Sequence, residues 1–396
     1  MLNDKINKNI NKNYFFVFLS NLAFTGGFWM IYLAFRGLSL TEIGLLEGIF
    51  HITSFTMEVP TGAVADIYGR KASRIIGRIF SLISTIMMIY SNSFFMFAVA
   101  FVFSALSYNL ESGAGDALIY DSLKLNKKEN GYMKVVGIQE AIYQATSIIS
   151  LIIGGWIGSF NYYLGYTITA IVAAINIIYS FSFVEPPVER RKYGLKNIFK
   201  GLLTQTAESF KLIVSNKKIG FLIISTQTIL AFCTSVFFYV QNYWKSTGFN
   251  ELQIGIFLAT GSGITALIAT QTHKLEKILK EKRLLIISPL IAVICLWGIT
   301  LTDFSIFFYI IISVIESVIF IASNDYVNKL IPSENRATII SFSSMAFSFM
   351  MVVVFPLFGN IAENHSFKTA FLILATAASI LFIVNTVLVC KFSRQR

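Results

Sequence analysis

Charged side chains are scarce in this chain of 396 residues, and their scarcity excludes a soluble globular protein. Only 13% of the residues are Asp, Glu, Lys or Arg, whereas 55% are hydrophobic and the mean hydropathy is +0.68. Soluble domains carry about 25% charged residues, which they need to cover surface that faces water. A chain with so few must face lipid over much of its surface. We therefore expect an integral membrane protein.

Cysteine and histidine are also rare, and their placement excludes several kinds of site. The three cysteines all lie in apolar runs, with neither a CxxC pair nor metal-ligand spacing, which excludes a disulfide framework and a zinc site. They are Cys233, Cys295 and Cys390. With three histidines and no HExxH, GxSxG or phosphate-cradling glycine-rich loop, the chain offers no catalytic motif. We expect no enzyme, no cofactor and no metal.

Long apolar runs, in contrast, are abundant. A transmembrane helix needs about 20 predominantly apolar residues. The sequence predicts twelve such helices, at 14–35, 42–65, 72–91, 94–119, 135–158, 161–184, 219–243, 252–272, 284–302, 304–325, 337–361 and 367–390. The predicted fold class is therefore an all-α, multi-pass membrane protein.

The distribution of positive charge predicts the orientation. Of the 32 Lys and Arg residues, only Arg36, Lys245 and Lys368 fall in the loops after odd-numbered spans. The others lie at the termini, in the loops after even-numbered spans, or just inside the span ends beside them. Because cytoplasmic loops hold the excess of Lys and Arg, both termini are predicted to be cytoplasmic. The net charge of +11 is spread over every inner loop, so we expect no nucleic-acid partner.

The spans group into two halves. We predict six-helix bundles at 1–184 and 219–396, joined by a cytoplasmic linker at 185–218 in which apolar residues recur at helical spacing, as in an amphipathic surface helix. The halves echo each other, since Thr41–Leu45 is matched by Leu252–Ile256 after the equivalent outer loop. Such a 6+6 repeat is the architecture of many secondary transporters, whose substrate site lies near the midplane between the halves.

The loop between the second and third spans carries the most specific motif, Gly62-Ala-Val-Ala-Asp66-Ile-Tyr-Gly69-Arg70-Lys71. It resembles the G-x-x-x-D-[RK]-x-G-R-[RK] loop of the major facilitator superfamily, with Ile67 in place of a basic residue. The preceding Glu58-Val-Pro-Thr-Gly62 looks like the E-x-P-T-G variant of bacterial members. The resemblance implies a twelve-helix transporter that works by alternating access.

The motif also predicts a latch at the inner surface. Its five expected residues are Gly62, Asp66, Gly69, Arg70 and Lys71. The glycines permit a tight turn and close helix approach, and Asp66 can face the positive N-terminus of a neighbouring helix. By resemblance that neighbour is the eleventh span, near 336–338. Arg70 is within reach of a carboxylate on the fourth span, either Asp116 or Asp121.

Acidic residues inside the spans are candidate coupling sites, because a charge at mid-bilayer costs about 2.5–3.5 kcal/mol on insertion scales. Glu47, His51 and Glu58 share one stripe of the second span at 100° per residue, where a histidine between carboxylates can hold and pass a proton. The alternative is a packed polar stripe that joins helices. Glu111 and Glu316 lie nearest the middle of the equivalent fourth and tenth spans, and Glu140 is a weaker candidate on the fifth.

These features favour a proton-coupled exporter of amphiphilic or cationic small molecules, because aromatic rings and buried acids suit bulky hydrophobic cations. The residues expected to line its cavity are Trp29, Tyr32, Asn109 and Tyr239. No Lys or Arg lies near the middle of any predicted span, which argues against an anionic substrate. The fourth span also lacks the Arg, and the fifth the Pro of a G-P-x-x-G-G signature, that proton-driven members of the superfamily often carry.

Two alternatives stay open. The first is a transporter of one specific metabolite, by uptake or export and as a uniporter or symporter. The second, a membrane-embedded enzyme or a non-transporting receptor, has no motif in its favour. We expect a monomer in the lipid bilayer of the cell membrane, with protons and one small molecule as its partners.

Overall fold

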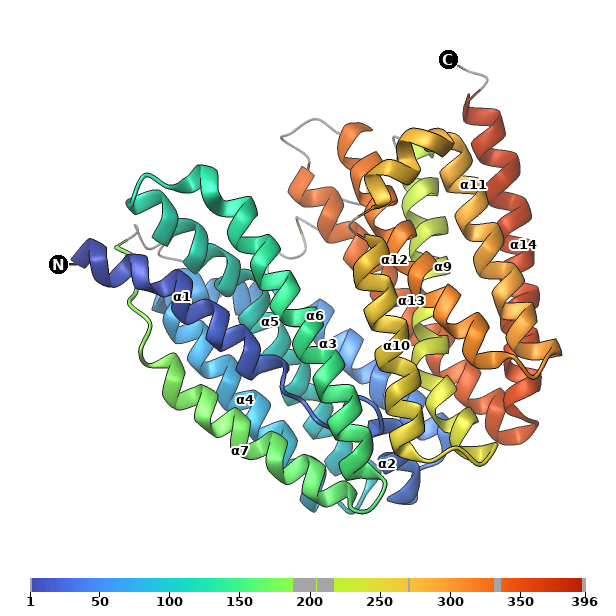
Figure 1. Cartoon of the computed structure of the whole chain (residues 1–396), viewed down its shortest axis with the longest axis horizontal. Helices are drawn as coiled ribbons and strands as arrows, with labels where there is room; N and C mark the ends of the chain where they lie inside the picture. The colour runs from blue at the N-terminus through green and yellow to red at the C-terminus, as the bar shows by residue number, and fades with distance from the viewer. Residues whose placement is uncertain (1, 188–203, 205–216, 270, 331–335, 394–396) are drawn as a thin grey trace. The chain divides into compact units, whose positions relative to one another are not determined.

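The computed structural model of the chain describes residues 2–187, 204, 217–269, 271–330 and 336–393. Within these ranges the regular structure is entirely helical (Figure 1). The helices are α1 Leu2–Asn21, α2 Trp29–Phe35, α3 Leu40–Tyr68, α4 Arg70–Tyr90, α5 Phe94–Leu125, the 3₁₀ turn η1 Glu129–Gly131, α6 Tyr132–Gly158, α7 Tyr162–Ser180, α9 Lys217–Ser246, α10 Glu251–Ala269, α11 Thr272–Leu301, α12 Ser305–Leu330, α13 Arg336–Asn364 and α14 Phe367–Ser393.

Most of the predicted spans appear as single helices. Over the described residues, ten helices are long and apolar enough to cross a membrane, and they coincide with the third to twelfth predicted spans. The second predicted span falls within α3, which contains Pro60. The count of twelve spans and the cytoplasmic termini stay predictions. Most of the predicted linker helix lies outside the described residues.

The first predicted span is not a continuous helix. The chain leaves α1 after Asn21 and enters α2 at Trp29, so the residues between them are non-helical. The last carbonyl of α1 is satisfied by a side chain, because Ser150 Oγ donates to the Asn21 carbonyl at 2.9 Å. This bond replaces the helical partner that a terminal carbonyl lacks.

Glycines on α6 and α7 make room for the interruption. A Cβ added at Gly154 would lie 2.1 Å from the Phe24 carbonyl oxygen, and one added at Gly165 would lie 2.7 Å from the Phe28 ring. The Phe24 amide, which has no helical acceptor, donates to Thr169 Oγ1 at 3.1 Å. Hydropathy alone could not predict this break, because it depends on the shape of two neighbouring helices.

The described helices pack into two units, each with its own core. Unit 1 comprises 1–29, 49–203 and 250–256, and unit 2 comprises 30–48, 204–249 and 257–396. Unit 1 packs α4 against α5 and α7, and unit 2 packs α11 against α12 and α14. A buried apolar cluster in unit 1 includes Phe16, Leu118 and Phe183. Unit 2 contains residues 30–48 of the predicted N-terminal half, and unit 1 contains residues 250–256 of the predicted C-terminal half. The division into halves stays a prediction.

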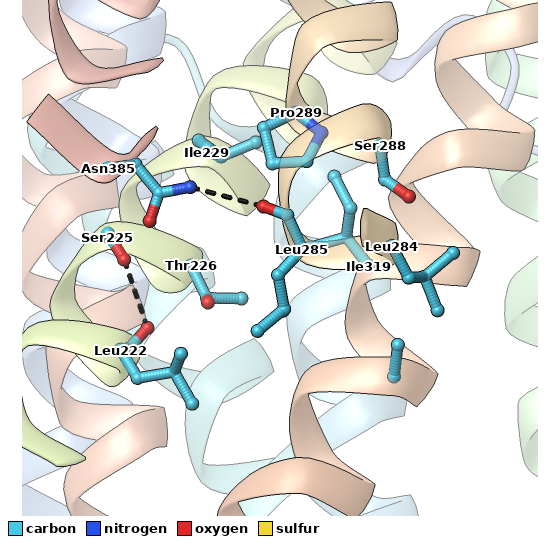
Figure 2. Close-up of a pocket in the computed structure, with 11 residues that line it drawn as sticks. Leu222, Ser225, Thr226, Ile229, Leu284, Leu285, Ser288, Pro289, Ile319 and Asn385 are labelled. Carbon is cyan, nitrogen blue, oxygen red and sulfur yellow. Dashed lines mark hydrogen bonds between the residues drawn. The ribbon is translucent and has the colours of Figure 1, made fainter. Parts of the chain in front are cut away.

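In unit 2 an asparagine compensates for a proline inside a helix. Pro289 lies within α11 and has no backbone N–H, so the Leu285 carbonyl four residues earlier loses its helical donor. Asn385 on α14 supplies one, with its Nδ2 at 3.3 Å from that carbonyl oxygen. Figure 2 shows this bond at the edge of a small cavity that Ser225, Thr226 and other residues of α9, α11, α12 and α14 line. Its volume of about 20 Å³ suffices for one water molecule.

We expect Asn385→Leu to lower the free energy of unfolding by about 1–3 kcal/mol, since it leaves a buried carbonyl without a donor. Denaturant unfolding in detergent measures this loss. The matched background is Pro289→Ala, which restores the backbone amide and gives the Leu285 carbonyl a helical partner again. On that background Asn385→Leu should cost much less. An equal loss on both backgrounds would show that Asn385 acts through packing alone.

Candidate functional site

The glycine-rich motif from Gly62 to Lys71 spans the end of α3 and the start of α4, with Gly69 between them. Gly69 adopts φ 100°, a conformation that favours glycine. The Glu185 carboxylate accepts the backbone amides of Arg70 at 2.8 Å and of Lys71 at 2.7 Å. It thus satisfies two of the N–H groups that the first turn of a helix leaves without a partner, at its positive end. A Cβ at Gly69 would lie 2.7 Å from a Glu185 oxygen.

Sequence reasoning missed Glu185 as a functional residue and placed it only at the start of the linker. The residue lies 115 positions from Arg70, so no local pattern connects them. The signal that was present is a carboxylate followed by two prolines directly after a span.

We expect Glu185→Ala to destabilise the start of α4 by about 1.5–3 kcal/mol, because two amides lose a charged acceptor. Thermal unfolding of the purified protein measures the effect. Glu129→Ala is the matched control, since Glu129 is an exposed acid in the 3₁₀ turn η1. If both variants unfold alike, the cap contributes nothing.

Of the two predicted partners of Arg70, the structure pairs it with Asp121, through Arg70 Nη1 and Asp121 Oδ2. Asp116 is exposed on α5, and Asp66 is exposed near the end of α3. Lys71 Nζ donates to the Phe181 carbonyl at 2.8 Å. Gly62 has open space at its Cβ position. Asp66 belongs to unit 1 and residues 336–338 to unit 2, so the latch stays a prediction.

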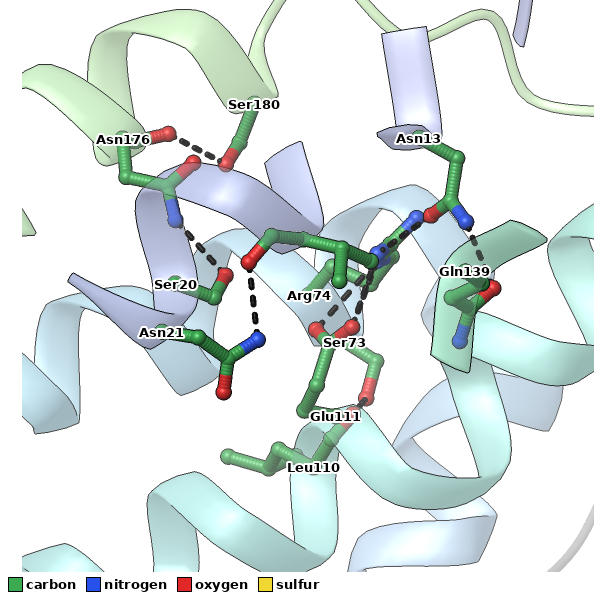
Figure 3. Close-up of polar contacts among 11 residues, drawn as sticks. Asn13, Ser20, Asn21, Ser73, Arg74, Leu110, Glu111, Gln139, Asn176 and Ser180 are labelled. Carbon is green, nitrogen blue, oxygen red and sulfur yellow. Dashed lines mark hydrogen bonds and ion pairs between the residues drawn. The ribbon is translucent and has the colours of Figure 1, made fainter. Parts of the chain in front are cut away.

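A buried ion pair in unit 1 holds Glu111. Arg74 Nε and Nη2 donate to the Glu111 carboxylate at 3.0 Å and 2.8 Å, and Arg74 Nη2 also donates to Asn13 Oδ1 at 2.9 Å. Asn13 Nδ2 donates in turn to Gln139 Oε1 at 2.8 Å. Figure 3 shows this chain of contacts, which joins α1, α4, α5 and α6. The Arg74 guanidinium lies over the Phe16 ring, 3.9 Å from its centroid.

This pair changes the interpretation of Glu111, which the sequence presented as a cavity carboxylate for a proton or a cation. Its charge is already balanced by an arginine that is 1% exposed. Arg74 and Arg78 lie one and two turns inside α4, near the end of the predicted span and not at its middle. An arginine inside one span and an acid inside the next was the signal that could have predicted the pair.

The polar stripe of α3 is partly used for packing. Ser54 Oγ donates to Asn109 Oδ1 at 2.7 Å, and Asn109 Nδ2 donates to the Ser54 carbonyl at 2.6 Å, so α3 and α5 are joined by a reciprocal pair. Glu47 and His51 are buried one turn apart on α3, whereas Glu58 is exposed. An exposed carboxylate within a membrane-spanning helix is expected to face water rather than hydrocarbon.

Exposed aromatic and acidic residues adjoin on α5 and α6 of unit 1. Tyr108 and Tyr143 are 60% and 44% exposed, and Tyr143 lies near both Glu140 and Tyr108. Glu140 is exposed and accepts a hydrogen bond from Gln144 at 2.8 Å. We call Tyr108, Glu140, Tyr143 and Gln144 the acidic–aromatic patch. Such a group can bind a cation through its carboxylate and its ring faces.

Glu316 in unit 2 differs from Glu111 in its surroundings. Its carboxylate accepts a hydrogen bond from Thr234 Oγ1 at 2.6 Å, and the described residues give it no ion pair. Cys233 and Tyr309, both fully or almost fully buried, lie beside it. A carboxyl group with a hydroxyl donor and no arginine or lysine beside it can bind either a proton or a cationic group.

Three of the four expected cavity residues have packing or hydrogen-bond partners within their own unit, and the cavity itself stays a prediction. Tyr239 is fully buried and donates to the Phe355 carbonyl at 2.7 Å, and Tyr32 is fully buried with its hydroxyl accepting from Arg36. The Asn109 side chain is hydrogen-bonded to Ser54. Trp29 is half-buried with its ring 5.8 Å from that of Phe101. Aromatic residues in helices pack against one another as well as lining cavities, and the sequence does not distinguish the two.

A family model described as Major Facilitator Superfamily matches residues 13–354. The chain belongs to the Major Facilitator Superfamily. It is 24% identical to the MFS-type transporter YxaM of Bacillus subtilis (strain 168) over 372 residues, which are 91% of this chain and 90% of YxaM. It is 23% identical to the quinolone resistance protein NorA of Staphylococcus aureus over 235 residues, which are 59% of this chain and 57% of NorA.

Solved transporters share the fold of this superfamily member. The nucleoside transporter NupG superposes with a TM-score of 0.75 at 15% identity and covers 98% of both chains. The peptide transporter POT superposes with a TM-score of 0.77 at 12% identity, over 98% of this chain and 95% of POT. The protein is therefore a multi-pass transporter of the plasma membrane, as its sequence predicted.

Proposed function

We propose that this Major Facilitator Superfamily transporter exports amphiphilic organic cations in exchange for protons. The observation that carries the proposal is Glu316, a carboxylate inside unit 2 with one hydroxyl donor from Thr234 and no ion pair among the described residues. Membrane interiors disfavour a lone charge. Such a carboxyl is stabilised when it holds a proton or a cation, and the two compete for the same oxygens.

The acidic–aromatic patch of unit 1 supports a cationic substrate. Organic cations bind over the faces of tyrosine rings, and a nearby carboxylate adds charge attraction. Tyr108, Glu140 and Tyr143 combine both features within exposed positions of α5 and α6. Arg74, a buried cation of this unit, forms an ion pair with Glu111. Its charge is therefore not available to bind an anionic substrate.

The similarity to NorA, a quinolone resistance protein, supports export of drug-like compounds. The YxaM, NupG and POT comparisons support transport by this fold without indicating a substrate. Glu111, which the sequence proposed as a second coupling residue, contributes to the proposal only as part of an ion pair. Glu47, His51, Glu58 and Glu140 remain candidates for the rest of a proton path.

The test uses the full-length protein in cells and in proteoliposomes, with ethidium as the organic cation. Energised cells that express the protein should extrude ethidium, and a protonophore should abolish the extrusion. In proteoliposomes an imposed pH gradient should drive ethidium movement, whereas uridine and dialanine, which represent nucleosides and peptides, should not move. Empty liposomes give the background.

Two results would contradict the proposal. Ethidium extrusion that persists unchanged with the protonophore would exclude coupling to protons. Movement of uridine or dialanine without movement of ethidium would favour the alternative, a transporter of a specific metabolite.

A further inference from the structure

Two lysines from different helices meet at the C-terminal end of α7. The ammonium group of Lys12 on α1 donates a hydrogen bond to the Ser182 carbonyl. The ammonium group of Lys71 on α4 donates one to the neighbouring Phe181 carbonyl at 2.8 Å. Both bonds use carbonyls that the end of a helix leaves free. Each ammonium group has three N–H donors, so most of these donors are still available after the bond to the carbonyl.

A third lysine adds to this positive charge. Lys8 is exposed and lies one turn before Lys12 on α1. Burial lowers the pKa of Lys12, and the charges of Lys71 and Lys8 lower it further, in that order. The like charges are therefore close enough to repel one another.

The nearby carboxylates are already in use. Glu185 accepts the backbone amides of Arg70 and Lys71, and Asp121 pairs with Arg70. Among the described side chains, Lys8, Lys12 and Lys71 have no ion pair, and we call these three residues the lysine cluster.

An exposed apolar surface lies on α7 beside the lysine cluster. Ile171, Ile175 and Ile178 of α7 are 55%, 48% and 73% exposed, and their spacing of four and three residues places them on one face. The stripe continues to Phe181, which is 59% exposed, and the Phe181 carbonyl holds Lys71. An exposed apolar stripe on a membrane helix faces acyl chains.

We propose that the lysine cluster binds the phosphate headgroup of an anionic phospholipid whose acyl chains lie along Ile178 and Phe181. The phosphate oxygens accept the free N–H groups of the lysines, and the lipid lies at the membrane surface that the predicted topology makes cytoplasmic. Basic pockets between helices on this side of a membrane are sites for anionic headgroups. Charge and apolar surface together select a lipid over a free phosphate ion, which would use the lysines alone.

The test measures lipid binding to the full-length, detergent-purified protein by native mass spectrometry. Dioctanoyl phosphatidylglycerol should bind at one site more tightly than dioctanoyl phosphatidylcholine. Lys12→Gln/Lys71→Gln should weaken phosphatidylglycerol binding roughly thirtyfold, which is about fivefold for each lysine. Lys8→Gln alone should weaken it about fivefold. Because Lys8 is exposed, this variant tests the cluster even if the double variant fails to fold.

The matched control is Lys127→Gln/Lys128→Gln, which removes the same charge from the α5–η1 connection of the same unit. It should change binding by less than about twofold. Equal losses in the control and in the Lys12/Lys71 variant would indicate a general effect of net charge and overturn the site. Displacement of bound phosphatidylglycerol by inorganic phosphate would indicate a free-anion site and overturn the assignment to a lipid.

Discussion

Replacing Glu316 by Gln is expected to abolish uphill transport of ethidium. Glutamine keeps the size of the side chain and mimics the protonated acid, so the proposed coupling group can no longer gain and lose a proton. In one-for-one exchange of a proton for a monovalent cation, no net charge crosses the membrane and the membrane potential contributes nothing. One pH unit then supplies about 1.4 kcal/mol, enough for a substrate ratio of about tenfold. In Glu316→Gln that ratio should fall to one.

The measurement is the ethidium ratio across proteoliposomes under an imposed pH gradient. Downhill exchange of ethidium should also slow in Glu316→Gln, because the proton and the cation are proposed to bind the same carboxylate. Thr234→Val is the informative companion, because it removes the hydroxyl that donates to Glu316 and leaves the carboxylate in place. It should lower the rate while keeping a ratio above one. A Glu316→Gln variant that still accumulates ethidium against its gradient would exclude Glu316 as the coupling site.

Glu111→Leu is expected to lower the free energy of unfolding by about 3–5 kcal/mol, the cost of leaving a buried charge without its partner. The partner left behind is Arg74, which is 1% exposed. Arg74→Met should lower the free energy of unfolding by less, because the Glu111 side chain that it leaves unpaired is 23% exposed and is therefore less desolvated than Arg74. Both variants break the same ion pair, so the difference between their free energies of unfolding reflects how deeply the remaining charge is buried.

The double variant Arg74→Met/Glu111→Leu completes the cycle. It leaves no unpaired charge, so it should be more stable than Glu111→Leu and close to the original protein. Denaturant unfolding in one detergent gives all four values, and Lys127→Met, which removes a charge without breaking an ion pair, is the control. Independent, additive losses in the double variant would contradict a shared ion pair.

A comparison of Glu111 with Glu316 distinguishes a structural acid from one that couples transport to protons. Glu111→Gln and Glu316→Gln remove one carboxylate each from the equivalent fourth and tenth predicted spans. We expect the first to reduce the amount of folded protein, and the second to leave folding intact and remove the pH-driven ratio. The sequence pattern treats the two acids alike, since nothing in their local context distinguishes them.

The sequence by itself determined the membrane class, ten of the spans and the superfamily. Hydropathy is summed along the chain, so a run of 20 apolar residues is visible without knowledge of any neighbour. The motif from Gly62 to Lys71 is equally local. The interruption between α1 and α2 escaped this reasoning, because it depends on the space that Gly154 and Gly165 leave on other helices.

Only the tertiary structure decided what each charged group contacts. Arg74 and Glu111 lie 37 residues apart, and Arg70 and Glu185 lie 115 apart. Whether two such residues meet depends on the rotation and the axial position of each helix, and a difference of one residue turns a side chain by 100° to another face. Packing of the helices fixes both quantities, which is why Glu111 became part of an ion pair while Glu316 kept only the hydroxyl of Thr234 among the described side chains.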